Sequence, residues 1–526
     1  MRTYASAMAL WLGMIALALP AWAGTPRSGG TLVIGIGADA TGLDPRTVMN
    51  NESAFVMAGV LEGLTQYKRG TTEVEPGLAE SWTVSPDGKT ITFRLRRGVK
   101  FHDGTPLDAD AVIFDFDRIL NEKSPFYYRA GVTAGSFVPE FYGEVAGYQK
   151  VDQYTVRVTL KRKFAPFLDG LATAFSGLVS PAAVKQWGPV EIAKHPIGTG
   201  PFKFVEWVRN DHITVEANPD YWGGKPYLDR IVYRIIPENS VRLLNLEQGS
   251  VDIVDGINPD DIQRIKANPK LVLLEQAGAT INGISMNNQR APFDNVKVRQ
   301  AMNYAVNREE LNNFLYKGVA VLATNPVPPV TWSFDKSLTG YAYDPARAKQ
   351  LLAEAGHPNG FKVEMIAFPN PRGYNPVGGA RLAVAVQDYL RRVGVEVSIK
   401  QLEWGTYLKT IRSGDYLFGP AGWSADNGDP DNFLFSLYSS TTWGSGNNSR
   451  YKNPEVDKLL QDAQETFDRE QRIQLYRKAG RIIMDEAPWV FVNHTKLVRA
   501  TSARVQGYVL NPTQMFFHMN QVWVTQ

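Results

Sequence analysis

Between residues 361 and 423 the hydrophobic positions change repeatedly from a strand pattern to a helix pattern. The pattern predicts strands at residues 361–369, 395–403 and 416–423, and amphipathic helices at residues 380–394 and 404–414. Strands that alternate with helices form parallel sheets with right-handed connections. In such sheets ligands bind outside the carboxyl ends of the strands. We therefore expect a binding site at that edge of the sheet.

Two oppositely charged residues follow the predicted strands. Arg372 comes shortly after the first strand and Asp426 shortly after the last. A guanidinium presents a planar fork of N–H donors that suits a carboxylate, and a lone aspartate suits an ammonium group. Together the two residues are a candidate site for a zwitterion.

Near the N-terminus, Gly35, Gly37 and Ala40 have the G-x-G-x-x-A spacing of a dinucleotide-binding turn. That site requires a helix to begin at once, so that the helix N-terminus faces the pyrophosphate. Here Pro45 follows, and helix-like sequence starts only near Ser53. We interpret the segment as a strand and a turn without a nucleotide.

A compact α/β unit is predicted up to about residue 195. An Asp-Gly pair at residues 87–88 favours a tight hairpin, and the alternating apolar positions from Ile91 to Leu95 predict one buried strand face. A helix at residues 108–120 and a strand at residues 152–162 follow.

Several later helices have recognisable ends. Asn258 is a predicted N-cap before Pro259, and residues 294–318 predict one or two helices. Asp344 stands before another helix-starting proline, and Gly356 is the predicted stop.

The first 23 residues have the order of a secretory signal peptide. Arg2 is the lone charge, an apolar run extends from Met8 to Leu19, and Ala21 and Ala23 flank a small-x-small cleavage site. The run is shorter than the roughly 20 residues of a spanning helix. We predict export, cleavage after Ala23 and a soluble mature protein.

The sequence contains no cysteine. Disulfides, thiolate metal sites and cysteine nucleophiles are therefore excluded, and so is the lipid-modified cysteine of a bacterial lipoprotein. The protein is expected free in the periplasm or secreted, without a lipid anchor. Removal of Arg2 from the 56 basic residues leaves 55 against 53 acidic ones. This near-neutral balance gives no argument for a nucleic-acid partner.

The segment GWSADNGDPDNF at residues 422–433 carries Asp426, Asp429 and Asp431. A calcium loop counted from Asp429 lacks the required glycine and glutamate, and one counted from Asp426 has Pro430 at a ligand position. We interpret Asp429 and Asp431 as turn and capping residues.

Other catalytic or metal-binding patterns are missing from the sequence. The six histidines are scattered without an i, i+4 pair, and neither a G-x-S-x-G elbow nor a spaced pair of acid–base carboxylates stands out. Trp423, at a strand end, fits either the core or a pocket wall. We expect no metal, no cofactor and no enzymatic activity.

Taken in order, several segments resemble the extracellular solute-binding proteins of peptide ABC transporters, and most closely their periplasmic dipeptide-binding branch. The segments are GLAESWTVSPDGKTITFRLRRGVKFHDGTPLDADAV, PIGTGPF, NPDYWGGKPYLDRI, FDNVKVRQAMNYAVNRE, YDPARAKQLLAEAG, EWGTYLKTIRSGDY and GWSADNGDPDNF. The resemblance covers essentially all of the mature chain.

This resemblance implies the α/β fold of the type II periplasmic binding proteins. Two lobes would close over the ligand, joined by a hinge of crossing strands, with an extra α/β domain inserted in the first lobe. The first lobe would comprise residues 24–62, 196–287 and 501–526, the inserted domain residues 63–195, and the second lobe residues 288–500.

The resemblance also implies site residues. In dipeptide-binding members, an aspartate of the tryptophan-containing loop binds the ammonium group, and an arginine after an earlier strand binds the carboxylate. The matching residues are Asp426 and Arg372. Further residues implied to face the ligand are Tyr374, Trp423 and Asn427 in the second lobe and Met49 and Asn50 in the first.

A dipeptide or short peptide would be the ligand, an inner-membrane ABC permease the partner, and the protein a monomer. Relatives carry oligopeptides, glutathione, aminolevulinate, haem or nickel, which remain alternatives. A secreted hydrolase is a further alternative, but it would need a nucleophile and base that no motif supplies. Ala425 stands where some dipeptide binders have glycine, and the cysteines of some close relatives are absent.

Overall fold

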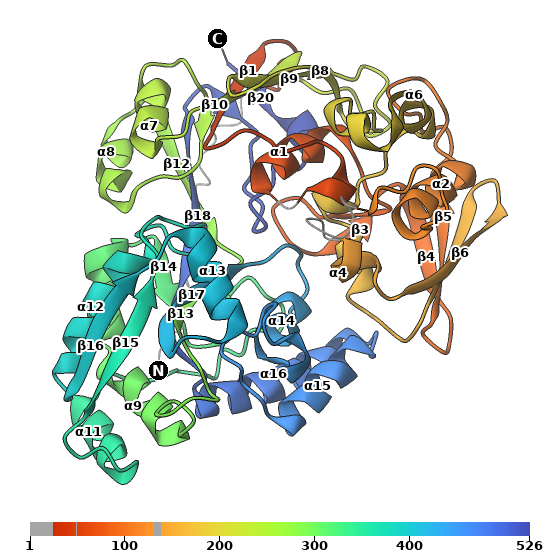
Figure 1. The fold of residues 1–526 in the computed structure, drawn as a ribbon. Helices are drawn as coiled ribbons and strands as arrows, with labels where there is room; N and C mark the ends of the chain where they lie inside the picture. Colours follow the sequence, from red (N-terminus) through yellow and green to blue (C-terminus); the bar gives the residue numbers. More distant parts are fainter. Residues whose placement is uncertain (1–24, 49, 130–137, 526) are drawn as a thin grey trace, which may run out of the picture.

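The computed structural model describes residues 25–48, 50–129 and 138–525. The predicted signal peptide and Met49 lie outside these residues. Figure 1 shows two groups of strands connected through the long strand β18, with a smaller sheet beside the first group. A 12-stranded sheet includes both groups, and its main order is β16-β15-β17-β13-β18-β11-β1-β10-β9-β8.

The first group of strands, called the β1 half below, comes from distant parts of the chain. Its strands are β1 (Thr31–Ile36), β8 (Phe202–Val208), β9 (His212–Ala217), β10 (Arg230–Ile235), β11 (Ile253–Val254) and β12 (Leu271–Ala277). Strand β1 lies between β10 and β11 and is parallel to both. No helix follows β1 directly, since helix α1 begins only at Asn51, so the dinucleotide interpretation is rejected.

The second group, called the β15 half below, contains the predicted strand and helix alternation. Its strands are β13 (Thr280–Met286), β14 (Ala320–Leu322), β15 (Phe361–Ala367), β16 (Val395–Gln401) and β17 (Phe418–Ser424). Strand β15 is parallel to both β16 and β17, as expected. Strand β13 adds an antiparallel neighbour to β17, so the sheet as a whole is mixed.

Strand β18 (Trp489–Ser502) pairs with both halves. Its first part is antiparallel to β13 and β14, and its second part is antiparallel to β12 and β11. The other crossing runs from β12 to β13 through Gly278, where an added Cβ would lie 2.5 Å from the Thr495 carbonyl oxygen. Only glycine permits this close approach of the two crossing segments.

The smaller sheet has the order β4-β5-β7-β6 and is antiparallel. Its strands are β4 (Ala79–Val84), β5 (Thr90–Leu95), β6 (Val145–Asp152) and β7 (Thr155–Leu160). Gly88 has a φ of 68° in the turn between β4 and β5, which confirms the predicted hairpin. Ile91, Phe93 and Leu95 are buried, as predicted.

The short strands are β2 (Thr65–Tyr67), β3 (Val74–Pro76), β19 (Val505–Gln506) and β20 (Trp523–Val524). Among the described residues up to 270, the α-helices are α1 (Asn51–Val60), α2 (Ala109–Leu120), α4 (Val138–Tyr142), α5 (Phe167–Gly170), α6 (Pro181–Glu191), α7 (Asn239–Glu247) and α8 (Ile262–Ala267). The later helices are α9 (Val296–Ala305), α10 (Arg308–Leu311), α11 (Pro345–Glu354), α12 (Gly379–Arg391), α13 (Trp404–Ser413), α14 (Asp431–Tyr438), α15 (Pro454–Gln464) and α16 (Arg469–Glu486).

Two predicted helix starts have different outcomes. The Asp344 side chain accepts a hydrogen bond from the Arg347 amide and caps α11, as the sequence predicts. Asn258 precedes a short 3-10 turn and makes no side-chain capping bond, because its amide instead contacts Asn239 and Asp261. The prediction that the Asn258 side chain caps this helix is therefore wrong.

Among the described residues, none of the helices is long and apolar enough to cross a membrane. The four-stranded sheet lies wholly within residues 63–195, whereas the β1 half draws strands from both sides of that segment. This connectivity is compatible with an inserted domain, and the residue boundaries of the lobes remain a prediction.

Candidate functional site

The loops after β15 and β17 lie side by side. An added Cβ on Gly422 of β17 would come 2.1 Å from the Tyr374 ring, so that ring packs directly on the strand backbone. At Gly373, an added Cβ would lie 3.4 Å from the Ser424 hydroxyl. The structure thus brings the loop of Arg372 to the end of the strand that precedes Asp426.

Arg372 sits in a tight turn whose backbone exchanges hydrogen bonds with Asn375, at 2.9 and 2.8 Å. Its guanidinium stacks over Trp404, 3.7 Å from the ring centroid. The Nε atom is buried without a hydrogen-bond partner in the described structure. Burial lowers the pKa of Arg372 from its ordinary value. Since an arginine keeps its proton even so, a partly desolvated cation remains.

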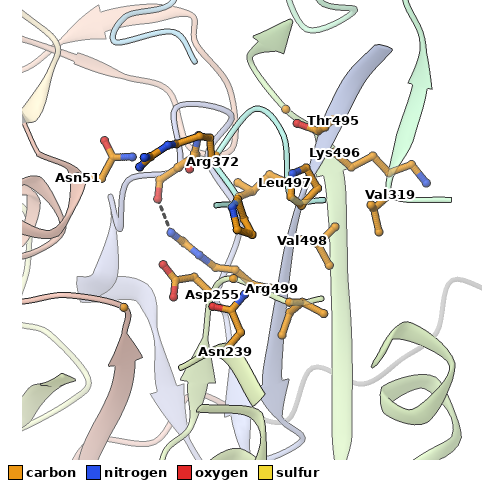
Figure 2. Close-up of a pocket in the computed structure, with 18 of the residues that line it drawn as sticks. Asn51, Asn239, Asp255, Val319, Arg372, Thr495, Lys496, Leu497, Val498 and Arg499 are labelled. Carbon is orange, nitrogen blue, oxygen red and sulfur yellow. Dashed lines mark hydrogen bonds between the residues drawn. The ribbon is translucent and has the colours of Figure 1, made fainter. Parts of the chain in front are cut away.

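Arg372 lines a cavity of about 370 Å³ between the two halves of the molecule (Figure 2). The β1 half contributes Asn51, Glu52, Arg242 and Asp255, and the crossing segments contribute Gly278, Thr280 and Thr495–Arg499. In Figure 2 the Arg372 side chain extends toward Asn51, and Arg499 enters the same space. The cavity therefore gathers positive charge from three distant parts of the sequence.

The side-chain amide of Asn50, which is predicted to face the ligand, forms hydrogen bonds within the protein. Its Oδ1 accepts a hydrogen bond from the Thr41 hydroxyl at 2.8 Å, and its Nδ2 donates to Glu52 at 3.1 Å. The residues that follow, Asn51 and Glu52, line the cavity instead. Burial raises the pKa of Glu52. The ligand-facing roles of Asn50 and of Met49, which is outside the described residues, remain predictions.

Asp426 is connected to the other side of the cleft through Asn432. The Asn432 Oδ1 accepts hydrogen bonds from the Asp426 amide at 3.2 Å and from Trp423 Nε1 at 2.9 Å. Its Nδ2 donates to Glu140 of α4 at 2.8 Å. One buried amide therefore ties the loop after β17 to a helix nearly 300 residues earlier in the chain.

Asp426 and Glu140 are two acidic residues that both hydrogen-bond to Asn432, Asp426 through its backbone amide and Glu140 through its carboxylate. Asp426 is half-buried and Glu140 is exposed, although neighbouring protein atoms surround both carboxyl groups. Burial raises the pKa of Asp426 to about 7, and Asn432 opposes part of that shift. Burial and the Asp426 charge raise the pKa of Glu140 to about 8. Because the Asp426 charge disfavours ionisation of Glu140, a nearby ammonium group would stabilise the doubly ionised pair.

A second cavity, of about 590 Å³, is lined by Glu140 but not by Asp426. Its walls include Trp423, Asn427, Glu140 and Asn432. Trp423 lines this cavity and also packs against a hydrophobic core cluster, so both possibilities for it are observed. Of the predicted site residues, Arg372 lines the first cavity and Trp423 and Asn427 line the second. Asp426, Tyr374 and Asn50 line neither of these two cavities.

Asp429 and Asp431 shape the loop, as expected, but they do more than form a turn. Asp429 accepts the amide hydrogen of Asp431 at 2.9 Å and forms a buried bidentate pair with Arg472 at 2.7 and 2.8 Å. Asp431 accepts a hydrogen bond from Gln464 at 3.0 Å and makes no helix cap, since α14 starts after Pro430 without a capping side chain. The capping prediction for Asp431 is wrong.

Among the described residues, none of the groups of histidine, aspartate and glutamate side chains has the geometry to bind a metal ion. Sequence reasoning missed Glu140, Asn432, Arg472 and Arg499. Only Asn432 had a signal, because it lies in the tryptophan-containing segment. The other three come from ordinary helix and strand patterns far from that segment.

Residues 73–445 match the model of a protein family described as bacterial extracellular solute-binding proteins, family 5, middle. Heme-binding protein A of Haemophilus influenzae is 39% identical over 464 residues, which cover 86% of this chain and 85% of that protein. The dipeptide-binding protein of Escherichia coli is also 39% identical over 464 residues, with 85% and 86% covered.

A solved structure extends the similarity to nearly the whole fold. The ABC transporter-associated periplasmic binding protein DppA of Helicobacter pylori, in complex with the peptide STSA, is 35% identical with a TM-score of 0.80. The match covers 95% of this chain and 99% of that chain. The mixed α/β fold described above is therefore shared with a solute-binding protein of known structure.

Proposed function

Because the chain belongs to the bacterial extracellular solute-binding proteins of family 5, we propose that it captures dipeptides for an ABC importer. Members of this family bind solutes without catalysing a reaction, so the chain is not an enzyme. The secreted hydrolase is thereby set aside. Relatives are named for dipeptides, heme and glutathione, so the choice of solute has to rest on the residues of this chain.

The observation that carries the proposal is the placement of Arg372 and Asp426. They follow the neighbouring parallel strands β15 and β17, and the loop of Arg372 packs against the end of β17. An extended dipeptide spans about 7 Å between its termini. A free dipeptide would offer a carboxylate to Arg372 and an ammonium group to Asp426. Both protein groups are partly withdrawn from water, which strengthens each charge interaction.

The remaining predicted residues would surround the peptide. Tyr374, Trp423 and Asn427 would line the space on the β15 side, and Met49 and Asn50 would approach from the β1 side. The two cavities of about 370 and 590 Å³ leave room for varied side chains. Water in such spaces can satisfy different polar groups, which suits an uptake protein that accepts many sequences.

We further propose that the two halves are the lobes of a closing clamp. The lobes would be residues 24–62, 196–287 and 501–526 against residues 288–500, with residues 63–195 as an inserted domain. The bonds of Asn432 to Glu140 and of the Gly428 amide to Tyr67 support closure, because each joins the loop after β17 to the earlier part of the chain. Closure would exclude water from the ligand. The loaded protein, a monomer in the periplasm, would then dock on a membrane permease.

Calorimetry with one dipeptide in three forms tests the ligand assignment. The free peptide should bind, whereas the N-acetylated and C-terminally amidated forms should each bind at least ~10-fold more weakly, because each form removes one terminal charge. Equal affinity for all three forms would show that the termini are not recognised and would reject the proposal.

Native mass spectrometry of freshly purified protein addresses the alternative solutes. A retained dipeptide mass supports the proposal, and retained haem, glutathione, aminolevulinate, nickel or a longer peptide contradicts it. If the protein is empty, thermal-shift measurements with each solute follow. A ligand at 100 times its dissociation constant adds about 2.7 kcal/mol of stability.

A further inference from the structure

Arg499 is a deeply buried cation on the long strand β18. Its side chain is 1% exposed, and its guanidinium stacks on Phe516 at 3.8 Å from the ring centroid. One terminal nitrogen donates to the Tyr508 hydroxyl and the other to the Gln514 carbonyl oxygen. The Nε atom is buried without a partner, and among the described residues no carboxylate lies within 4.0 Å of the guanidinium.

The charge of Arg499 is therefore uncompensated. Neutral oxygens and an aromatic face orient a guanidinium, but they do not cancel its charge. A buried charge is unfavourable unless an opposite charge approaches it. Arginine cannot relieve this by releasing its proton, because its pKa is too high.

Two of the other three cations of the same cavity differ from Arg499. Arg242 forms an ion pair with Asp255 at 3.4 Å, and Lys496 forms one with Glu275 at 3.3 Å. Arg372, like Arg499, has an unpartnered Nε, and no ion pair joins it to another described residue. The cavity thus contains two cations whose charges have carboxylate partners and two whose charges have none.

The acidic groups of the cavity do not remove this excess. Asp255 is already paired with Arg242. Glu52 lines the cavity, where burial raises its pKa, and among the described residues it forms no ion pair with Arg499. Tyr508, which contacts Arg499, has its pKa raised by burial and stays a neutral phenol. An anionic ligand is the remaining source of compensation.

We propose that Arg372 and Arg499 form a subsite for two anionic groups, so that preferred ligands are short peptides with an acidic C-terminal side chain. The inference rests on the proposed function, in which Arg372 binds the peptide carboxylate. The acidic side chain would then enter the cavity of about 370 Å³ that Arg499 also lines (Figure 2). Arg499 would act mainly through its field, since its two terminal nitrogens are already engaged.

Calorimetry with Ala-Glu and Ala-Gln tests this subsite, because the two dipeptides have nearly the same shape and differ by one charge. The wild-type protein should bind Ala-Glu about 10-fold more tightly. Arg499→Gln should reduce this ratio toward one, and Arg499→Lys should retain most of it. Arg94→Gln is the matched control, because it removes the same charge from an exposed position on β5 and should leave the ratio unchanged.

The outcomes separate this inference from the proposed function. Equal binding of the two dipeptides by the wild type rejects the acidic subsite and leaves dipeptide capture intact. Failure of both to bind rejects the two together. A preference for Ala-Glu that survives in Arg499→Gln rejects the role of Arg499. If that variant does not fold, circular dichroism will show it, and the wild-type ratio with the Arg499→Lys ratio then decides.

Discussion

The candidate site has an acidic part around Asp426 and Glu140 and a basic part around Arg372 and Arg499, called the acidic end and the basic end below, and the two handle charge in opposite ways. At the acidic end, Asp426 and Glu140 both hydrogen-bond to Asn432, and burial raises their pKa values to about 7 and about 8. At the basic end, Arg372 and Arg499 keep their protons and have no ion-pair partner among the described residues. The carboxyl groups of the acidic end can gain or lose a proton near neutral pH. The two arginines of the basic end keep their positive charge, which only a bound anion can neutralise.

This difference has a consequence for ligand binding. An ammonium group that reaches the acidic end must displace a proton from Asp426 or Glu140 at neutral pH. A carboxylate that reaches the basic end displaces only water. The two termini of a zwitterion would therefore be recognised with different pH dependences, and variants at each end should reveal it.

The largest effect is expected beneath the acidic end, at Asp429. Asp429→Ala leaves the buried Arg472 without its bidentate partner, which should lower the free energy of unfolding by about 3–5 kcal/mol. Urea unfolding followed by circular dichroism measures it. Asp462→Ala, which removes an exposed pair with Lys458, should lower stability by only about 0.5 kcal/mol. Similar losses in the two variants would contradict a structural role for the Asp429 pair.

At the acidic end itself, Asp426→Asn should weaken dipeptide binding by about 2–5 kcal/mol, because the ligand ammonium group loses its charged partner. Calorimetry at pH 8 measures this loss. The variant should also lose the discrimination between free and N-acetylated dipeptides. Retention of that discrimination would assign the ammonium group to another residue, with Glu140 the first to examine.

At the basic end, Arg372→Gln should weaken binding of free dipeptides by about 1.5–3 kcal/mol, the range for a hydrogen bond to a charged group. It should bind dipeptide acids and amides with similar affinity. Unfolding measurements provide the control, since Arg372 is only partly buried and its loss should change stability little. A variant that still prefers the acid would place the carboxylate elsewhere.

The smallest expected effect, counted per unit of pH, is the change in the free energy of unfolding caused by titration of the acidic end. The pKa of Asp426 is raised from 3.8 to about 7, so the folded state holds this proton more tightly than the unfolded state. Its contribution to stability is present below about pH 4 and is lost as the pH rises through 7. Ligand-free wild type should therefore lose stability relative to Asp426→Asn over this range, as thermal unfolding at a series of pH values would show.

Affinity should change in the opposite direction. Between pH 6 and 7, each unit of pH should strengthen dipeptide binding up to about tenfold, or about 1.4 kcal/mol, because the carboxylate must lose its proton first. Glu140→Gln removes the neighbouring charge and should move the midpoint to lower pH. A flat profile in the wild type would mean that Asp426 is ionised throughout.

The sequence predicts the scaffold of the site because the relevant signals are local. Periodicity from residue 361 to 423 predicts three strands and two helices, all of them observed. Parallel strands with helical connections bring the loops after β15 and β17 to one edge, so sequence patterns suffice to place Arg372 beside the loop of Asp426. The roles of these residues in binding remain predictions.

The remainder of the site depends on contacts between distant segments, which local patterns do not contain. Arg499 follows the ordinary alternation of a strand, and Glu140 belongs to a short helix. Nothing near Asp429 in the sequence indicates that Arg472 is its partner. Asn50 illustrates the reverse case, because the resemblance implies a ligand contact while its amide is bonded to Thr41 and Glu52.

The 14 residues of β18 also determine how the molecule should come apart. Its backbone amides belong to ladders in both halves, so opening either ladder along its length exposes hydrogen-bonding groups at the junction with the other. Hydrogen–deuterium exchange should therefore show continuous protection from Trp489 to Ser502, without a fast-exchanging break near Thr495. The two halves would then unfold as one cooperative unit, even if a ligand moves them as separate bodies.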